Sequence, residues 1–197
     1  MIIRDGHRGP VKLGINQEFL DWLLDPEHNG AGALTDFGCY GANLMTWLNG
    51  GERPISVTAI TQQLQKKNNP KVDDEATIIV TYENSTALIQ ASWNWPIGRK
   101  DMELYGLVGA AYADNRHDFR IRMAEGYDQF QEESMQLEEL PPPFNDPFSL
   151  LAAVVRGRVQ LEAFDLSSLE NNMLVMEILE AAKRSAKEHR TVFLSKN

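Results

Sequence analysis

The chain has 197 residues, 43% of them hydrophobic, which is enough apolar material for the core of one soluble domain. Its 28 acidic and 19 basic residues give a net charge of −9 at pH 7, and this charge repels phosphate backbones and anionic membranes. We therefore expect no nucleic-acid partner. Because no apolar run approaches the roughly 18 residues that cross a bilayer, we expect no membrane association either.

The single cysteine, Cys39, excludes an internal disulfide and fits a reducing compartment. The first residues, Met1–Asp5, lack the organisation of a signal peptide. A cytoplasmic location is therefore expected, unless the native amino terminus lies upstream of Met1. The four histidines are scattered without metal-ligand spacing, so no metal site is expected.

The amino-terminal part is predicted to contain a strand end, a turn and a helix. Met1–Arg4 has the character of a strand, and Asp5–Pro10 is rich in turn-forming residues. His7 and Arg8 lie in this glycine-containing turn, where polar side chains can reach a ligand; a solvated turn is the simpler alternative. Gln17–Leu24 has apolar residues at helical spacing and is stopped by Asp-Pro.

The next helix is predicted over Gly32–Leu48 and is ended by Asn-Gly-Gly. At about 3.6 residues per turn, four of its side chains form one stripe: Asp36, Tyr40, Asn43 and Trp47. Glycines in its apolar face let the helix lie close to its packing partner. A carboxylate and a phenol one turn apart form a plausible acid/base or substrate-hydroxyl pair. The alternative is a helix that only covers a sheet, with Asp36 favoured in its first turn by the dipole.

The centre of the chain is predicted to be rich in strands. The segments with strand composition are Ile55–Leu64, Ala76–Tyr82, Thr86–Trp93, Met102–Tyr105, Ala110–Ala113 and Phe119–Met123. Short turns at 83–85 and 106–109 join two pairs of these segments, which predicts antiparallel hairpins. The acidic stretch Gln131–Glu139 and the prolines at 141–143 are expected to form a surface excursion.

Two motifs beside these strands have both a functional and a structural interpretation. Trp93 and Trp95 point to the same side of an extended segment, and aromatic faces stack well on sugar rings. Packing in a core or an interface explains them at least as well. The acidic run Asp73–Glu75 could bind a cation, but charges that precede a hydrophobic strand are the more common explanation.

The carboxy-terminal part is predicted to be helical, with a short strand at Thr191–Leu194. The first apolar stripe, closed by Gly157, consists of Phe148, Leu151, Ala152 and Val155. A capping box at Ser167–Glu170 opens a helix that reaches about Lys187. The apolar stripe of that helix is expected in the core: Leu169, Met173, Met176, Leu179 and Ala182. The elements together predict an α+β fold, a largely antiparallel sheet with helices packed on one face.

The segment Gly32–Leu44, G-A-L-T-D-F-G-C-Y-G-A-N-L, resembles the substrate-domain helix of the glucose–fructose oxidoreductase/inositol dehydrogenase/MocA superfamily. Many members have histidine four residues after the aspartate, and one branch has tyrosine, as at Tyr40. Three further segments match in order: Val72–Thr77, Tyr105–Gly109 and Ser168–Asn172. The resemblance covers essentially the whole chain. It implies an open-faced sheet of the glyceraldehyde-3-phosphate dehydrogenase-like carboxy-terminal domain type.

Proteins of this superfamily begin with a Rossmann domain, whose Gly-rich turn and Glu-Lys-Pro motif are missing from this sequence. The segment Gly30-x-Gly32 lacks the last glycine of G-x-G-x-x-G and follows a predicted helix rather than a strand. Residues 1–197 are therefore expected to form a single substrate-binding and oligomerisation domain. We expect NAD or NADP to serve the full-length protein, and neither to bind tightly to this chain alone.

By resemblance, the chain is the substrate-binding half of a nicotinamide-dependent oxidoreductase that acts on a sugar, polyol or related hydroxylated compound. In this interpretation Tyr40 handles the hydroxyl proton, Asp36 orients Tyr40 or binds a substrate hydroxyl, and Asn43 contacts substrate. The remaining candidate substrate-binding residues are Trp93, Trp95, His7 and Arg8. The alternative is a stand-alone ligand-binding or oligomerisation module without redox activity. Self-association is expected through the open sheet face, which needs cover.

Overall fold

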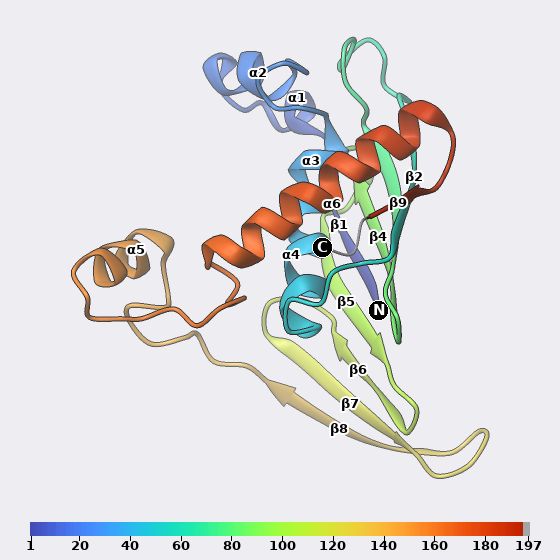
Figure 1. Ribbon diagram of the computed structural model, residues 1–197, viewed down its shortest axis with the longest axis vertical. Helices are drawn as coiled ribbons and strands as arrows, with labels where there is room; N and C mark the ends of the chain where they lie inside the picture. Colours follow the sequence, from blue (N-terminus) through green and yellow to red (C-terminus); the bar gives the residue numbers. More distant parts are fainter. Residues whose placement is uncertain (195–197) are drawn as a thin grey trace.

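The computed structural model describes residues 1–194, which form a nine-stranded sheet with the helices on one side (Figure 1). The strands are β1 (Ile2–Gly6), β2 (Ser56–Gln62), β3 (Glu75–Thr81), β4 (Thr86–Ser92), β5 (Arg99–Tyr105), β6 (Gly109–Ala113), β7 (Asp118–Ala124), β8 (Phe130–Gln136) and β9 (Val192–Phe193). The helices are α1 (Pro10–Leu13), α2 (Gln17–Leu23), α3 (Ala33–Asp36), α4 (Gly38–Leu48), α5 (Pro147–Val155) and α6 (Leu169–Glu188). The predicted α+β class is confirmed.

The strand order is β8-β7-β6-β5-β1-β4-β3-β2-β9. Both predicted hairpins are present, as β3–β4 and β5–β6. All neighbouring strands are antiparallel except β1 and β4, which run parallel. The first strand extends to Gly6, two residues beyond the predicted end, and lies in the middle of the sheet. It therefore joins the two hairpin groups into one sheet.

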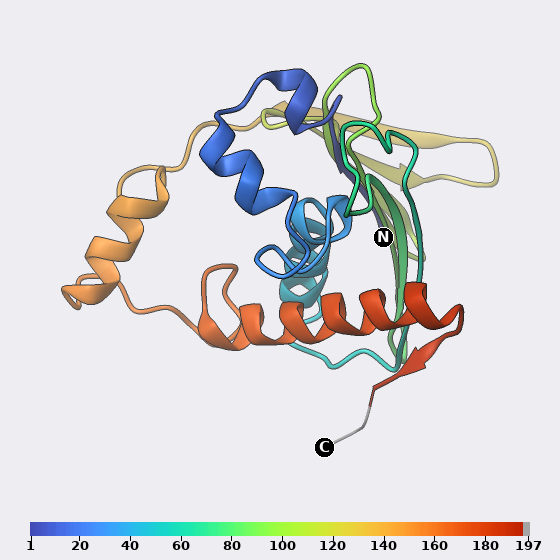
Figure 2. The ribbon, with the colours of Figure 1, turned by 90° about the horizontal axis from the view of Figure 1, so that it is seen from above.

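Helices α4 and α6 cover the part of the sheet made by β1–β4 and β9 (Figure 2). Strict alternation places Val57, Ile78 and Ile89 in the core beneath them, each at most 1% exposed. A Cβ atom at Gly41 of α4 would lie only 2.6 Å from Cγ2 of Ile89. Glycine here permits the close approach of helix and sheet that the sequence predicted.

The strands β5–β8 form the other part of the sheet, and no residue from Asn94 to Ala152 is buried. The register continues the core side of β1 across these strands, because Ile3 pairs with Met102 and Met102 with Ala113. The apolar residues on this side are Met102, Leu104, Phe119, Ile121, Met123 and Met135, and Lys100, Gln131 and Glu133 share the same side. We call it the uncovered face, because no helix of residues 1–194 packs extensively on β5–β8.

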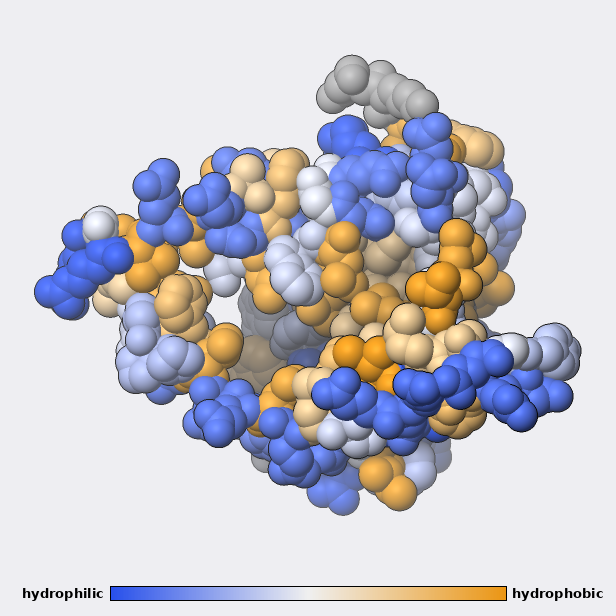
Figure 3. All heavy atoms as spheres, turned by 90° about the horizontal axis from the view of Figure 1, so that it is seen from below, coloured by the Kyte–Doolittle hydropathy of each residue, from blue (hydrophilic) through white to orange (hydrophobic). Residues whose placement is uncertain are grey.

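The segment that carries α5 leaves the body of the molecule after β8 and returns only at α6 (Figures 1 and 2). Its predicted apolar stripe lies outside the core, since Phe148 is 81% and Val155 78% exposed. Seen from below, apolar side chains surround a hollow between this arm and the body (Figure 3). The arm therefore exposes a helix face of the kind that is normally buried.

The predicted core stripe of the last helix is partly wrong. Leu179 and Ala182 are buried, but the amino-terminal part of α6 extends past the sheet and exposes Leu169, Met173 and Met176. The buried side of α6 is instead shifted by one position along the helix, to Leu174, Val175, Ile178 and Ala181 among others. Ser168 caps the helix by accepting a hydrogen bond from the backbone N–H of Asn171.

Two boundaries also differ from the sequence prediction. The Gly32–Leu48 helix is divided at Phe37, because Asp73 accepts hydrogen bonds from the N–H groups of Gly32 and Leu34 and so holds α3 as a separate turn. The acidic stretch from Gln131 forms the edge strand β8 rather than a surface excursion. There Glu132 pairs with Arg120 and Arg122 of β7, which neutralises the charge of the acidic strand.

Candidate active site

Asp36, the last residue of α3, is fixed by a buried tryptophan. Trp93 follows β4, is completely buried, and donates a hydrogen bond from Nε1 to Oδ2 of Asp36 at 2.9 Å. Burial raises the pKa of Asp36, and the hydrogen bond from Trp93 and the charges of His7 and Lys100 oppose this shift. In this structure Trp93 therefore orients Asp36, and its ring is packed in the core rather than open to a sugar.

Tyr40 lies one turn further along, in the first turn of α4, and is 44% exposed. The Lys100 ammonium of β5 lies over its ring, with Nζ 3.7 Å from the ring centroid. Burial raises the pKa of Tyr40 and Lys100 lowers it, while the nearby charges of Cys39, Asp36 and Asp5 raise it further. Within residues 1–194 no side chain or backbone group hydrogen-bonds the Tyr40 hydroxyl, which leaves it available to a ligand.

Asp5 brings a second buried carboxylate to the same place. It pairs in register with Lys100 across β1 and β5, and Lys100 Nζ lies 3.0 Å from its Oδ2. The Asp5 side chain is 7% exposed, and burial raises its pKa while Lys100 lowers it. His7 follows β1, and its Nδ1 accepts a hydrogen bond from the Gly9 backbone N–H at 3.0 Å. Its ring meets that of Phe37 edge-on, with centroids 4.8 Å apart.

A cavity of about 740 Å³ adjoins this group. Asp5, His7, Phe37 and Lys100 line one part of it, and the loop 113–116 lines another. Met102 of the uncovered face also belongs to its wall. A small hydroxylated molecule has room here, beside the Asp5 carboxylate, the His7 imidazole and the Lys100 ammonium group. Asp36 and Tyr40 do not line the cavity, and they adjoin it through Phe37 and Lys100.

The other predicted site residues lie around this group to different degrees. Trp95 is half-buried against Gly6, and its backbone N–H donates to the carbonyl of His7 at 3.2 Å. Arg8 is exposed in the turn that follows β1. The Asn43 amide donates to the carbonyl of Leu166 at 2.9 Å and to Oδ1 of Asn172 at 3.2 Å, so it ties α4 to the start of α6. The structure thus brings together Asp36, Tyr40 and His7, and it gives Asn43 a role in packing.

Sequence reasoning missed Lys100 and Asp5. Both lie in segments without a motif, and only the β1–β5 register brings them together. A carboxylate and an ammonium facing each other on paired strands would be a recognisable signal once that register is known.

The Asp73–Glu75 run serves the fold. Besides the role of Asp73 at α3, Asp74 is fully buried and accepts hydrogen bonds from the N–H groups of Leu64 and Gln65, both at 2.7 Å. In the described part of the chain no group of three His, Cys, Asp or Glu residues could hold a metal ion. No helix of that part is long and apolar enough to cross a bilayer.

Gly30 and Gly32 lie between α2 and α3. This placement lacks the preceding strand of a dinucleotide-binding turn.

A profile of the GFO/IDH/MocA C-terminal domain matches residues 6–112, which begin at the last residue of β1 and include the α3–α4 segment and the strands through most of β6. The chain belongs to this family of oxidoreductase domains. Curated proteins gave no match to the sequence.

Solved structures with the same fold include a protein of gentamicin A biosynthesis and two oxidoreductases. GenD2 from gentamicin A biosynthesis, solved in complex with NAD, is 23% identical with a TM-score of 0.69, and the alignment covers 99% of this chain and 55% of GenD2. The aldose-aldose oxidoreductase from Caulobacter crescentus, complexed with glycerol, is 22% identical with a TM-score of 0.67, and the alignment covers 98% of this chain and 54% of that protein. An NAD binding oxidoreductase from Klebsiella pneumoniae is 16% identical with a TM-score of 0.72, and the alignment covers 100% of this chain and 59% of that protein. The chain therefore spans little more than half the length of these proteins.

Proposed function

We propose that this chain is the substrate-binding half of a nicotinamide-dependent oxidoreductase that acts on a sugar, polyol or related hydroxylated compound. The observation that carries the proposal is the arrangement of Asp36 and Tyr40, a held carboxylate and an available phenol one turn apart, beside Lys100, which also lines the cavity. The family and the NAD and glycerol complexes of the similar structures support it.

In the proposed reaction Tyr40 holds the proton of the substrate hydroxyl at its phenol oxygen. A phenol whose pKa lies above its ordinary value is protonated at neutral pH, so it works as the acid when a carbonyl is reduced and needs help from a cation in the reverse direction. Asp36, oriented by Trp93, accepts a hydrogen bond from a second substrate hydroxyl, which leaves the single O–H of Tyr40 for the reacting oxygen. NAD or NADP, when bound, supplies the hydride transfer.

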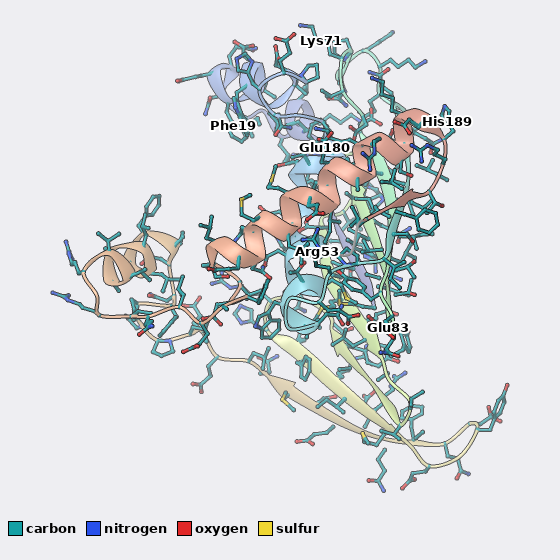
Figure 4. The ribbon with its side chains drawn as sticks, viewed as in Figure 1. Phe19, Arg53, Lys71, Glu83, Glu180 and His189 are labelled. Atoms are coloured by element: carbon teal, nitrogen blue, oxygen red, sulfur yellow. The ribbon has the colours of Figure 1, made fainter. Side chains whose placement is uncertain are left out.

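The uncovered face and the α5 arm support the presence of a further domain in the full-length protein. Both expose apolar side chains on the helix side of the sheet, next to the candidate site. Phe19 of α2 lies on the side of the molecule to which α5 also projects (Figure 4). A cofactor-binding domain seated against these surfaces would exclude water from the site and place the nicotinamide beside Tyr40.

The test is Tyr40→Phe in the full-length enzyme, with Tyr127→Phe in the exposed β7–β8 turn as the matched control. If Tyr40 transfers the proton, we expect kcat to fall by roughly a hundredfold or more, because a general acid/base contributes about that factor. Steady-state kinetics with a panel of polyols and aldoses measures it. A raised KM with unchanged kcat would assign Tyr40 to substrate positioning, and full activity would refute the proposal.

Self-association through the open side of the sheet, the side opposite the helices, is a second proposal. A stand-alone module would also associate in this way. Ile60 of β2, Ile79 of β3 and Phe193 of β9 are exposed there and form an apolar strip. The same side of β5–β8 is charged, so the apolar character expected of the whole open side is limited to this strip. We expect light scattering to show an oligomer that Ile79→Glu disrupts and Leu107→Glu, in the β5–β6 turn, does not. A monomer at all concentrations would refute it.

A further inference from the structure

Lys100 is the one ammonium group that the described residues bring into contact with both Asp5 and Tyr40. Its Nζ lies 3.0 Å from Asp5 Oδ2 and 3.7 Å from the centroid of the Tyr40 ring. The ammonium is thus the direct ion-pair partner of the buried Asp5 carboxylate, and His7 adds weaker favourable charge to the same group. The cation thus connects β1, β5 and α4 at a single point.

We propose that Lys100 is a positioning residue for Tyr40, held by Asp5 and clamping the phenol ring between α4 and β5. This proposal rests on the proposed function, since it concerns the group assigned there as the acid. It also gives the acid/base centre a cation from within the substrate domain, on a rigid strand.

The contacts favour a fixed arrangement of Lys100. A lysine side chain has four rotatable bonds and gains little from an ordinary surface ion pair, and this side chain is 65% exposed. Here its partner carboxylate is buried, and the aromatic face of Tyr40 attracts the same ammonium from a second direction. The two attractions together select one rotamer, and the ring beneath it is held in turn.

The charged groups around Tyr40 come from each element packed near it. Asp36 of α3 and Asp5 of β1 are negative when ionised, Cys39 is its chain neighbour, and Lys100 of β5 is positive. His7, after β1, and Lys100 both offset the carboxylates near the phenol, and Lys100 is the one that contacts the phenol ring. Negative charge that develops on the phenol oxygen spreads into the ring, which lies under the ammonium.

The experiment uses this 197-residue chain and needs neither cofactor nor substrate. A proton held over an aromatic ring is shifted upfield by the ring current, so we expect the ε-CH₂ protons of Lys100 to resonate upfield of all other lysines in the NMR spectrum. The shift should persist in Tyr40→Phe, which keeps the ring, and vanish in Tyr40→Leu. Unshifted Lys100 protons in the folded wild-type chain would overturn the proposal without any variant.

A second measurement follows the Asp5 carboxyl by carbon-13 NMR during an acid titration. Lys100→Gln should raise the apparent pKa of Asp5 by roughly one unit, a tenfold change in its acid constant, and Lys100→Arg should restore it. Lys71→Gln removes the same charge on the exposed loop between β2 and β3 (Figure 4) and should leave Asp5 unchanged. An Asp5 titration insensitive to Lys100→Gln would refute the clamp.

These outcomes are separable from those of the proposed function. Full activity of Tyr40→Phe in the full-length enzyme would remove the catalytic role of the phenol and leave the NMR signatures in place. Loss of the NMR signatures would remove the clamp and leave the kinetic assignment of Tyr40 standing.

Discussion

The two halves of the sheet have the same alternation of apolar and polar residues but opposite surroundings. In the half under α4 and α6, Val57, Ile78 and Ile89 are buried. In β5–β8, Ile121 and Phe119 occupy equivalent positions in the pleat and remain partly exposed. Burial is therefore decided by what lies above a strand and not by its pattern alone. In β5–β8 the apolar positions of the pattern are left partly exposed by residues 1–194.

The polar sides of the two halves differ as well. In the covered half, the Asp74 carboxylate is buried and accepts hydrogen bonds from backbone N–H groups. The other half carries ion pairs on its solvent side, among them Arg120 with Asp114 and with Glu132. Surface pairs of this kind stabilise a fold little, whereas buried acceptors are costly to remove. The covered half is thus expected to dominate the stability of the chain.

The largest expected effect is that of Asp74→Ala. The change leaves the N–H groups of Leu64 and Gln65 and the amide of Asn69 without their acceptor inside the protein. We expect a loss of about 4 kcal/mol in the free energy of unfolding, measured in urea. Glu132→Ala, on the solvent side of β8, should leave the unfolding midpoint unchanged. Equal losses from the two variants would contradict the comparison.

The hydrogen bonds to Asp74 also make the free energy of unfolding depend on pH. Burial alone would raise its pKa, but the hydrogen bonds from Leu64, Asn94, Gln65 and Asn69 outweigh this and hold the pKa below the ordinary value. A depressed native pKa gives stability that is present above about pH 4 and is lost as the pH falls through the native pKa. An acid unfolding curve of the wild-type chain measures this loss, and Asp74→Asn should flatten that part of the curve.

A matched pair of isoleucines gives the next largest effect. Ile78→Ala opens a cavity under α4 and should cost about 3 kcal/mol, whereas Ile121→Ala on the uncovered face should cost about 1 kcal/mol. Denaturant unfolding of both variants measures the difference. Similar losses in the free energy of unfolding would show that the uncovered face of β5–β8 is buried in solution. The oligomeric state would then show whether a second copy of the chain buries it.

The smallest expected effect concerns the candidate site. The native pKa of Asp36 is raised, chiefly by burial, so its charge destabilises the fold at neutral pH. Asp36→Asn keeps an acceptor for Trp93 Nε1 and should stabilise the chain by about 1 kcal/mol at pH 7. The gain should shrink as the pH falls from the native pKa toward about 4, where the unfolded carboxyl also protonates. Thermal unfolding across this range tests the sign.

The sequence allowed the hairpins and the Asp36–Tyr40 spacing to be predicted, because local periodicity and turns determine them. It did not reveal Lys100, since its contact with Asp5 depends on a register between strands that are far apart in the chain. It placed Met173 in the core, because an apolar stripe indicates burial without identifying the partner that buries it. The strand β8 was missed because its acidic residues suit a loop, until the arginines of β7 lie beside them.

The position of β1 has a consequence for anyone who wishes to cut this polypeptide. In residues 1–194 it alone links β4 to β5, parallel to one and antiparallel to the other. A fragment beginning at His7 would open a gap of about 10 Å between those strands, two strand spacings wide. Residues 1–6 thus hold the two parts of the sheet together, and removing them would divide the sheet between β4 and β5.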